Sequence, residues 1–232
     1  MDGDGSIQVN HWRKQSLLYR LEIKLKKTDG NERMLQEIER RLGGRVKVPI
    51  VKGVLGEDVL WVIDNKEEVR RMIKIYTEYP PVLTRKVMQL EFLKKCLEGD
   101  VGVEWYLANR NEKYAEQEKL IKAREEKYEL PSYFGPWFAG FSEVECSFRI
   151  RENQSYAIGQ KKERYLIEAI RQKLEIEAKV RLAIKAEEYW EIATAAKETL
   201  KRIIKQYETY PLIGEKLEQF ERWKVELENK CN

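Results

Sequence analysis

Two acidic residues, Asp4 and Glu145, occupy matching positions in two related segments of the chain. The segment WFAGFSEVECSF at 137–148 predicts a tightly packed helix followed by a strand, with Glu145 where the helix ends. The segment MDGDGSI at 1–7 matches the last part of the other segment, so that Asp4 corresponds to Glu145. After Glu145, apolar residues alternate with polar and basic ones, as in a strand with one exposed face. A carboxylate at a helix end beside a basic strand is therefore the first candidate site.

The remaining residue types exclude several other chemistries. His11 is the single histidine of the chain, so a Ser-His or Cys-His mechanism would have to use it, and nothing near it supports that role. Cys96, Cys146 and Cys231 are odd in number and far apart, which gives neither a disulfide framework nor zinc-ligand spacing. No apolar run approaches the roughly 18 residues of a membrane helix, and the acidic N-terminal residues do not predict a signal peptide.

Charge is unevenly distributed along the 232 residues, although the net charge is only +4. Residues 1–52 carry 12 basic and 7 acidic side chains, and residues 146–185 carry 10 and 5. Two basic segments against an acidic remainder favour two surfaces for a polyanion, whereas the alternative is ordinary solvated charge. The hydrophobic content of 42% suffices for one large domain or two small ones with a real core.

The first half predicts the order β-β-α-β-β-α-α. Its opening hairpin, at 6–27, alternates apolar and charged residues with period two, so one face is apolar and one is charged. Gly43-Gly44 predicts the end of the first helix, and Asp64 or Asn65 can cap the second. The expected elements after the hairpin are a helix to about Leu42, strands at about 45–52 and 58–63, and helices at roughly 66–77 and 84–97.

The second half repeats this order. Tyr210-Pro211 follows Tyr79-Pro80 by 131 positions, and Lys216 follows Lys86 by 130. Residues 110–129 are highly charged and lack Gly and Pro, which predicts one solvated helix between the halves. We therefore expect an α+β protein with repeats at 1–109 and 133–232 and a charged helical linker at 110–132.

The two segments with Asp4 and Glu145 resemble the LAGLIDADG motif of homing endonucleases and the related intron maturases. Phe138–Cys146 follows the motif over its full length, with Glu145 at the functional acid, whereas Asp2–Gly5 matches only its last residues. Cys146 replaces the usual glycine after the acid. The resemblance implies two αββαββα repeats related by a pseudo-twofold axis, each with a four-stranded antiparallel, saddle-shaped sheet. The first helix of repeat one is expected to be missing.

The resemblance also implies a metal centre. In the family, acids at the positions of Asp4 and Glu145 meet and hold divalent metal, which we expect to be Mg²⁺ bound through oxygen. Such a metal supports hydrolysis of a phosphodiester without a histidine. Lys86 and Lys216 match the place of a family lysine near the metal, where a cation stabilises charge growing on phosphate.

The outward residues of the strands are expected to contact nucleic acid. Arginine and glutamine can read base edges, and lysine mostly contacts phosphate. The first group is Gln8, Asn10, Arg20, Lys24 and Lys26, and the second is Arg149, Arg151, Lys179, Arg181 and Lys185. Val180, Leu182 and Ile184 alternate with the last three residues of the second group, which supports the outward assignment of those three.

Three functions remain open from the sequence. The first is a site-specific, Mg²⁺-dependent endonuclease of double-stranded DNA, acting as a monomer with internal pseudo-twofold symmetry. The second is a non-cleaving RNA-binding relative, either an intron maturase or a protein of the organellar ribosome, within a ribonucleoprotein. The third is an α+β domain whose repeat serves a protein interface. The resemblance implies an organelle, a mitochondrion or a chloroplast, as the location.

Overall fold

The chain forms two compact units, Met1–Leu120 and Ile121–Asn232. The structure is a computed structural model and describes residues 1–51, 53–99, 101–150 and 154–229. The boundary between the units falls within the predicted linker at 110–132. Among the described residues, no helix combines the length and the apolar character needed to cross a bilayer.

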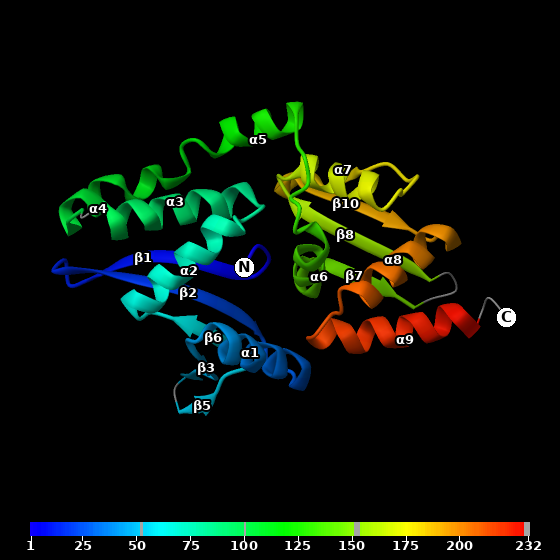
Figure 1. Cartoon of the computed structure of the whole chain (residues 1–232), viewed down its shortest axis with the longest axis horizontal. Coiled ribbons are helices and arrows are strands. Elements are labelled where there is room, and N and C mark those ends of the chain that lie inside the picture. The colour runs from blue at the N-terminus through cyan, green and yellow to red at the C-terminus, as the bar shows by residue number, and fades with distance from the viewer. Residues whose placement is uncertain (52, 100, 151–153, 230–232) are drawn as a thin grey trace. The chain divides into compact units, whose positions relative to one another are not determined.

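The first unit is built on a four-stranded antiparallel sheet with strand order β1-β2-β6-β3. Figure 1 shows α1 beside β6 and α3 beside β1. The elements are β1 (Gly5–Trp12), β2 (Ser16–Lys26), α1 (Asp29–Leu42), β3 (Arg45–Lys47), β4 (Ile50–Val51), β5 (Val54–Leu55), β6 (Asp58–Ile63), α2 (Lys66–Glu78), α3 (Thr84–Glu98), α4 (Val103–Asn109) and the 3-10 helix η1 (Arg110–Tyr114); α5 (Gln117–Glu126) crosses into the second unit.

Period-two alternation explains why one face of this sheet is covered by helices and the other is open. On β2, Leu21 and Leu25 are buried, whereas Arg20 is half-buried and Lys24 is exposed. Burial of the aliphatic side chains stabilises the sheet against its helices by roughly 1.5–3 kcal/mol per fully buried side chain. The Asn65 side chain accepts hydrogen bonds from the backbone N–H groups of Glu67 and Glu68, so it caps α2 as predicted.

Two predicted elements of the first unit are wrong in detail. The single strand expected at 45–52 is instead β3, followed by the separate two-stranded ribbon of β4 and β5. The single helix expected at 110–129 is broken into η1 and α5. Tyr114 explains the break: its hydroxyl accepts a hydrogen bond from Gln89 of α3 at 2.9 Å, and the Arg85 guanidinium lies 5.1 Å from its ring centroid. This tertiary contact overrides the local preference for helix.

The second unit has the same kind of sheet, with strand order β7-β8-β10-β9 and antiparallel pairing throughout. In Figure 1, α7 lies beside β8 and β10. The elements are α6 (Phe134–Glu145), β7 (Cys146–Arg149), β8 (Ser155–Lys161), α7 (Arg164–Lys173), β9 (Arg181–Ile184), the 3-10 helix η2 (Lys185–Glu187), β10 (Tyr189–Thr194), α8 (Lys197–Thr209) and α9 (Glu215–Asn229).

The helices confirm that the two units are repeats. α8 begins 131 positions after α2, and both helices are 13 residues long. α9 begins 131 positions after α3, and both are 15 residues long. Arg71 of α2 donates to the carbonyl of Leu42 at the end of α1, and its counterpart Arg202 donates to the carbonyl of Leu174 after α7. The predicted α+β fold with two repeats is therefore confirmed.

A hydroxyl network lies in the core of the second unit, where α6 meets α8 and β8. The Tyr207 hydroxyl donates to Ser142 Oγ at 2.8 Å and lies 2.9 Å from the Tyr156 hydroxyl, and all three residues are buried. Ser142 lies on the motif helix α6, and the network gives its hydroxyl a structural role, because a buried tyrosine hydroxyl requires an acceptor.

We expect Ser142→Ala to lower the free energy of unfolding by about 1–3 kcal/mol, because the two buried tyrosine hydroxyls then have one acceptor fewer, and one of their protons is left without a hydrogen bond. Urea unfolding measures this change. The double variant Ser142→Ala with Tyr207→Phe is the control, since removing both partners costs less than the sum of the single changes. Strictly additive losses, or no loss from Ser142→Ala, would contradict this account of the network.

Candidate nucleic-acid interface and its acidic residues

Glu145 is the last residue of α6, and β7 begins at the next residue. This confirms the predicted placement of the acid between helix and strand. Glu145 Oε1 accepts a hydrogen bond from Gln160 Nε2 of β8 at 3.2 Å. Because Gln160 lies on the strand that pairs with β7, the carboxylate is held at the corner where the helix and the sheet meet.

Tyr189 of β10 is close enough to Glu145 to be affected by its charge, and the sequence did not predict it as a site residue. Burial, followed by the negative charges of Glu145 and Glu191, raises the pKa of Tyr189 to about 12. A Cβ atom added to Gly159 would lie 2.6 Å from the Tyr189 hydroxyl, so only glycine leaves room for this ring over β8. The tyrosine therefore stays protonated at neutral pH and offers a hydroxyl donor near Glu145.

Asp4 lies in the turn that leads into β1 and is exposed. Loss of solvent around its carboxyl raises the pKa of Asp4, and the nearby positive charge of Lys86 opposes that shift. Lys86 is buried on α3, and its ammonium donates to the carbonyl oxygen of Gly5, directly after Asp4. The structure thus brings Lys86 to the acid of its own unit, as the resemblance implies. Burial lowers the pKa of Lys86.

Lys216, the counterpart of Lys86, lies near the start of α9 and donates to Gln219 Oε1 at 3.0 Å. Gln89 and Gln219 follow the two lysines at the same spacing, and neither was predicted. Gln89 also accepts from the backbone N–H of Ile7 at 3.3 Å, which fixes the start of β1. Each unit therefore carries a lysine and, three residues later, a glutamine on one helix, α3 in the first unit and α9 in the second.

Asp2 and Glu143 each stand two residues before the motif acid, and both cap a helix of their own unit. The Asp2 carboxylate accepts from the backbone N–H groups of Val82 and Leu83, before α3, at 3.1 and 2.9 Å. Glu143 Oε1 accepts from those of Ile213 and Gly214, before α9, at 2.5 and 2.9 Å. These hydrogen bonds connect the segment of each motif acid to the helix that carries the lysine. Because Asp2 and Glu143 both stand two residues before the motif acid, the repeat in the sequence could have revealed this pair.

The open face of the first unit carries the predicted residues of that half. Gln8 and Arg20 lie opposite each other on β1 and β2. Lys24 is bound to Asp58 at 2.7 Å, and Arg20 lies 3.7 Å from Asp64. Gln8, Asn10, Arg20, Lys24 and Lys26 alternate with the inward positions of their strands and are all half-buried or exposed. The structure thus brings these five side chains to one surface.

The second unit brings together only part of its predicted set. Arg149 and Arg181 lie on β7 and β9, and both bind Glu191 of β10. The prediction that Lys179 and Lys185 are strand residues is wrong: Lys179 precedes β9 and Lys185 begins η2, although both are exposed. Arg151 lies outside the described residues.

The apolar residues used to assign the face of β9 are not buried. Leu182 and Ile184 are 40% and 47% exposed, which contradicts the inward side that their alternation predicted. β9 is a short edge strand, and its register against β10 shifts between Tyr189 and Trp190. A register shift changes which side chains face the core, so alternation alone could not assign them.

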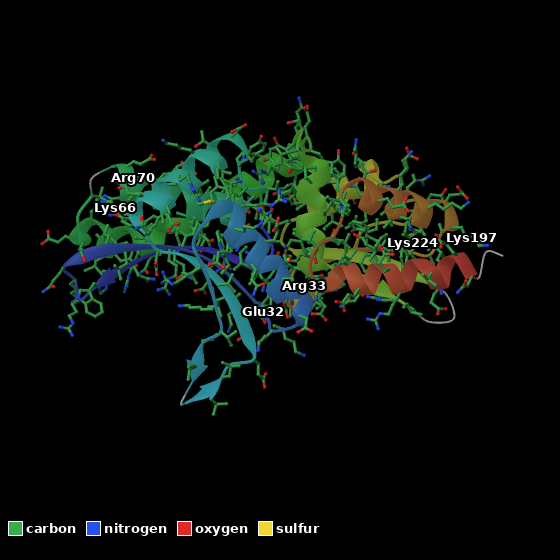
Figure 2. The ribbon with its side chains drawn as sticks, turned by 60° about the horizontal axis from the view of Figure 1, so that its bottom comes forward. Glu32, Arg33, Lys66, Arg70, Lys197 and Lys224 are labelled. Atoms are coloured by element: carbon green, nitrogen blue, oxygen red, sulfur yellow. The ribbon has the colours of Figure 1, made fainter. Side chains whose placement is uncertain are left out.

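The helices carry charged side chains as well. Figure 2 labels Glu32, Arg33, Lys66, Arg70, Lys197 and Lys224, all of which project from helices. Arg70 pairs with Glu67 of its own helix, and Lys224 lies 2.5 Å from Glu208 of α8. Cations of the sheet faces are paired too, so ion pairing does not distinguish the two kinds of surface. The open sheet faces are the candidates for a polyanion because the predicted polar and basic side chains gather there.

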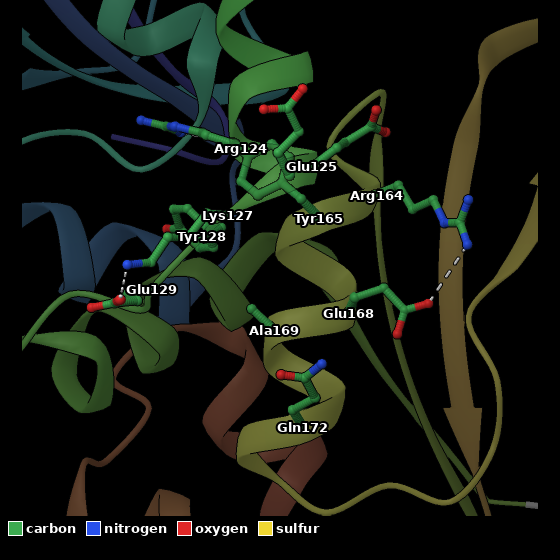
Figure 3. A pocket seen from close by; sticks show the side chains of 11 residues that line it. Arg124, Glu125, Lys127, Tyr128, Glu129, Arg164, Tyr165, Glu168, Ala169 and Gln172 are labelled. Carbon is green, nitrogen blue, oxygen red and sulfur yellow. Dashed lines mark hydrogen bonds and ion pairs between the residues drawn. The ribbon is translucent and has the colours of Figure 1, made fainter.

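A hollow of about 660 Å³ in the second unit has a structural role. Arg124 Nη1 donates to the Tyr165 hydroxyl at 2.7 Å, and the ring centroids of Tyr128 and Tyr165 are 4.7 Å apart. Figure 3 shows its charged lining, with ion pairs from Lys127 to Glu129 and from Arg164 to Glu168. These contacts hold the end of α5 and the segment after it against α7.

Each unit contributes one motif acid, Asp4 in the first and Glu145 in the second. Among the described residues there is no group of three or more His, Cys, Asp and Glu side chains that could enclose a metal. Mg²⁺ needs no such group, because it keeps several waters and binds through one or two carboxylates together with substrate phosphates. Asp4 and Glu145 each offer a carboxylate of the type that can be such a ligand.

These features define a class: a single chain of two α+β repeats, each with an open polar sheet face, a motif acid and a lysine on the helix that follows the Tyr-Pro pair. The model of the LAGLIDADG endonuclease family matches residues 1–97 and 138–227. The chain belongs to this family, and the predicted family is confirmed.

Curated relatives support the same membership. A probable intron-encoded endonuclease aI3 of Dictyostelium citrinum is 36% identical over 97% of this chain and 90% of that protein. The protein of the same description from Debaryomyces hansenii is also 36% identical, over 94% of this chain. The chain spans only 36% of the length of the Debaryomyces protein.

Solved structures show the same fold. The homing endonuclease I-GzeII, determined in complex with its DNA target, has a TM-score of 0.72 and 17% identity and matches 99% of this chain and 89% of that one. I-SmaMI, bound to uncleaved DNA in the presence of calcium ions, has a TM-score of 0.72 and 18% identity, over 99% of this chain and 90% of that one.

Proposed function

We propose that this chain is a site-specific endonuclease that hydrolyses double-stranded DNA with Mg²⁺ as cofactor. The observation that carries the proposal is the placement of Glu145, the last residue of α6, directly before the strand β7 that presents Arg149. A carboxylate that can hold a metal thus lies at the start of a strand whose outward side chain can bind nucleic acid. The relatives are described as probable intron-encoded endonucleases, which agrees with this activity.

Asp4 and Glu145 would hold the metal. When bound there, Mg²⁺ would polarise a phosphoryl oxygen and lower the pKa of a water molecule. Lys216 projects from α9, where its ammonium can stabilise negative charge that develops on the phosphate. Lys86 lies beside Asp4 and serves the same purpose in the first unit.

The open sheet faces would bind the DNA. The side chains of the first group on β1 and β2, together with Arg149 and Arg181, supply donors for phosphates and base edges. Because one chain has two open sheet faces, a monomer could bind a duplex target with one face for each half of the target sequence. The relatives' names, which describe them as intron-encoded, suggest an organellar genome as the origin. A mitochondrion or a chloroplast is the location that we propose.

A second candidate function is RNA binding without cleavage, as in an intron maturase or a ribosome-associated protein of an organelle. One observation favours it. Trp12 at the tip of the β1-β2 hairpin is 55% exposed, and the Arg13 guanidinium lies 4.9 Å from its ring centroid. An exposed aromatic ring beside arginine can stack on an unpaired base, which is how proteins commonly recognise single-stranded RNA.

Selection from random pools distinguishes the two candidates. The wild-type chain is offered randomised duplex DNA and, separately, randomised RNA, with Ca²⁺ present. We expect the DNA pool to converge on one sequence, with an affinity that falls steeply as salt increases. Convergence on an RNA hairpin, with no preferred duplex, would favour the second candidate, and salt-independent binding would contradict both.

A further inference from the structure

The open face of each unit carries an acid that binds two arginines from different strands. In the second unit, Glu191 lies 2.6 Å from Arg181 Nη2 and 3.3 Å from Arg149 Nη2, so one carboxylate joins β7, β10 and β9. The Glu191 side chain is only 12% exposed. An acid on a surface that binds a polyanion opposes binding, so its presence requires another explanation.

The first unit has the same arrangement, built from other positions. Asp64, directly after β6, receives two hydrogen bonds from Arg45 of β3, at 2.8 and 2.5 Å, and lies 3.7 Å from Arg20 of β2. The hydrogen bonds from Arg45 hold the pKa of Asp64 below its usual value, so the acid is charged at neutral pH. We refer to Asp64 and Glu191 as the shared carboxylates.

The shared carboxylates are not copies of each other. The second unit follows the first by 131 positions from β6 onward. Ala195 therefore corresponds to Asp64, and Leu60 corresponds to Glu191. The similarity of the two arrangements therefore does not follow from the repeat, which favours a shared physical role for the two acids.

We propose that Glu191 and Asp64 are positioning residues that determine sequence specificity, because each fixes two arginines in the orientation that reads base edges. The inference rests on the proposed binding of DNA by the open faces. A free arginine finds a phosphate at any sequence, whereas bidentate contact with guanine requires a fixed guanidinium plane. Arg149, Arg181 and Arg20 each approach the carboxylate through one nitrogen, whereas Arg45 uses two. Because a guanidinium has five N–H donors, each of these arginines keeps donors for a base.

The variant Glu191→Gln tests the proposal. Glutamine keeps the size of the side chain but offers one oxygen and an amide donor, so it can hold only one of the two arginines. The matched control is Glu198→Gln on α8, which makes the same change of charge at an acid that pairs with Lys201 at 2.8 Å. Thermal unfolding of every variant is compared with the wild type first, and Asp64→Asn provides an independent variant in the other unit.

Affinity is measured for the duplex that the wild type selects, for its single-base-pair variants and for random duplex. For Glu191→Gln we expect the affinity for random duplex to rise. The slope of log K against log salt should become steeper by about 0.9, because the released arginine makes one further phosphate contact. Discrimination against the wrong base pair should fall about tenfold at one subset of positions in the target, because one bidentate contact is lost. Asp64→Asn should lose discrimination at a different subset, and Glu198→Gln should behave as wild type.

Unchanged discrimination by Glu191→Gln and Asp64→Asn would overturn the inference while leaving the proposed function intact. The same is true if both variants lose affinity equally for every duplex, because the acids would then serve only the fold. If the wild type itself prefers no duplex, the proposed function fails, and the inference is overturned with it.

Discussion

We expect Glu145→Gln to reduce the rate of DNA cleavage by at least about 1,000-fold, because loss of a carboxylate ligand forfeits several kcal/mol of metal-dependent stabilisation. Affinity for the duplex should be unchanged or higher, since a negative charge that faces phosphate is removed. Single-turnover cleavage with Mg²⁺ and equilibrium binding with Ca²⁺ measure the two effects separately. Asp4→Asn should behave in the same way if the two acids share the metal.

Lys216→Met provides the comparison for this result. It removes a cation but no metal ligand, so it should slow cleavage by less than Glu145→Gln and leave binding nearly unchanged. A Glu145→Gln variant that cleaves at the wild-type rate would show that this carboxylate is not part of the catalytic centre. Equal loss of binding and cleavage would instead assign Glu145 a role in the fold.

Removing both arginines that share Glu191 should have the second-largest effect. We expect Arg149→Ala with Arg181→Ala to weaken binding of the selected duplex about 100-fold or more, because two donors are lost and the Glu191 carboxylate is left facing DNA. The slope of log K against log salt should become shallower, since fewer phosphate contacts are made. Filter binding or fluorescence anisotropy over a range of salt concentrations gives both quantities.

The control removes two cations from helices. Lys201 and Lys224 each pair with one glutamate, at 2.8 and 2.5 Å, as Arg149 and Arg181 pair with Glu191. Lys201→Ala with Lys224→Ala therefore makes the same change in net charge away from the sheet face. If this variant weakens binding as much as the arginine variant does, the helices rather than the open face bind nucleic acid.

The family and the order of the elements could be predicted because local patterns determine them. Period-two alternation on β2 separates Leu21 and Leu25 from Arg20 and Lys24, and the structure keeps that separation. Glu145 was placed correctly because a helix and a strand pattern meet at one residue. Such features depend on neighbours along the chain, which a single sequence contains in full.

Other features depend on contacts between distant residues, so the sequence could not reveal them. Tyr114 breaks the helix expected at 110–129 by binding Gln89 of α3. The bond from Glu191 to Arg149 spans 42 positions and follows from the pairing of β7, β8 and β10. The pairing of Asp4 with Glu145, and the catalytic roles of both, stay predictions.

Incubation of the wild type with its selected duplex tests most directly whether this chain cuts DNA at one site with Mg²⁺. With Mg²⁺ we predict breaks in both strands at one position within the bound sequence, and with Ca²⁺ we predict binding without breaks. Prior removal of divalent metal should abolish cleavage, and added Mg²⁺ should restore it. A duplex that is bound tightly but stays intact with either Mg²⁺ or Mn²⁺ would contradict the claim.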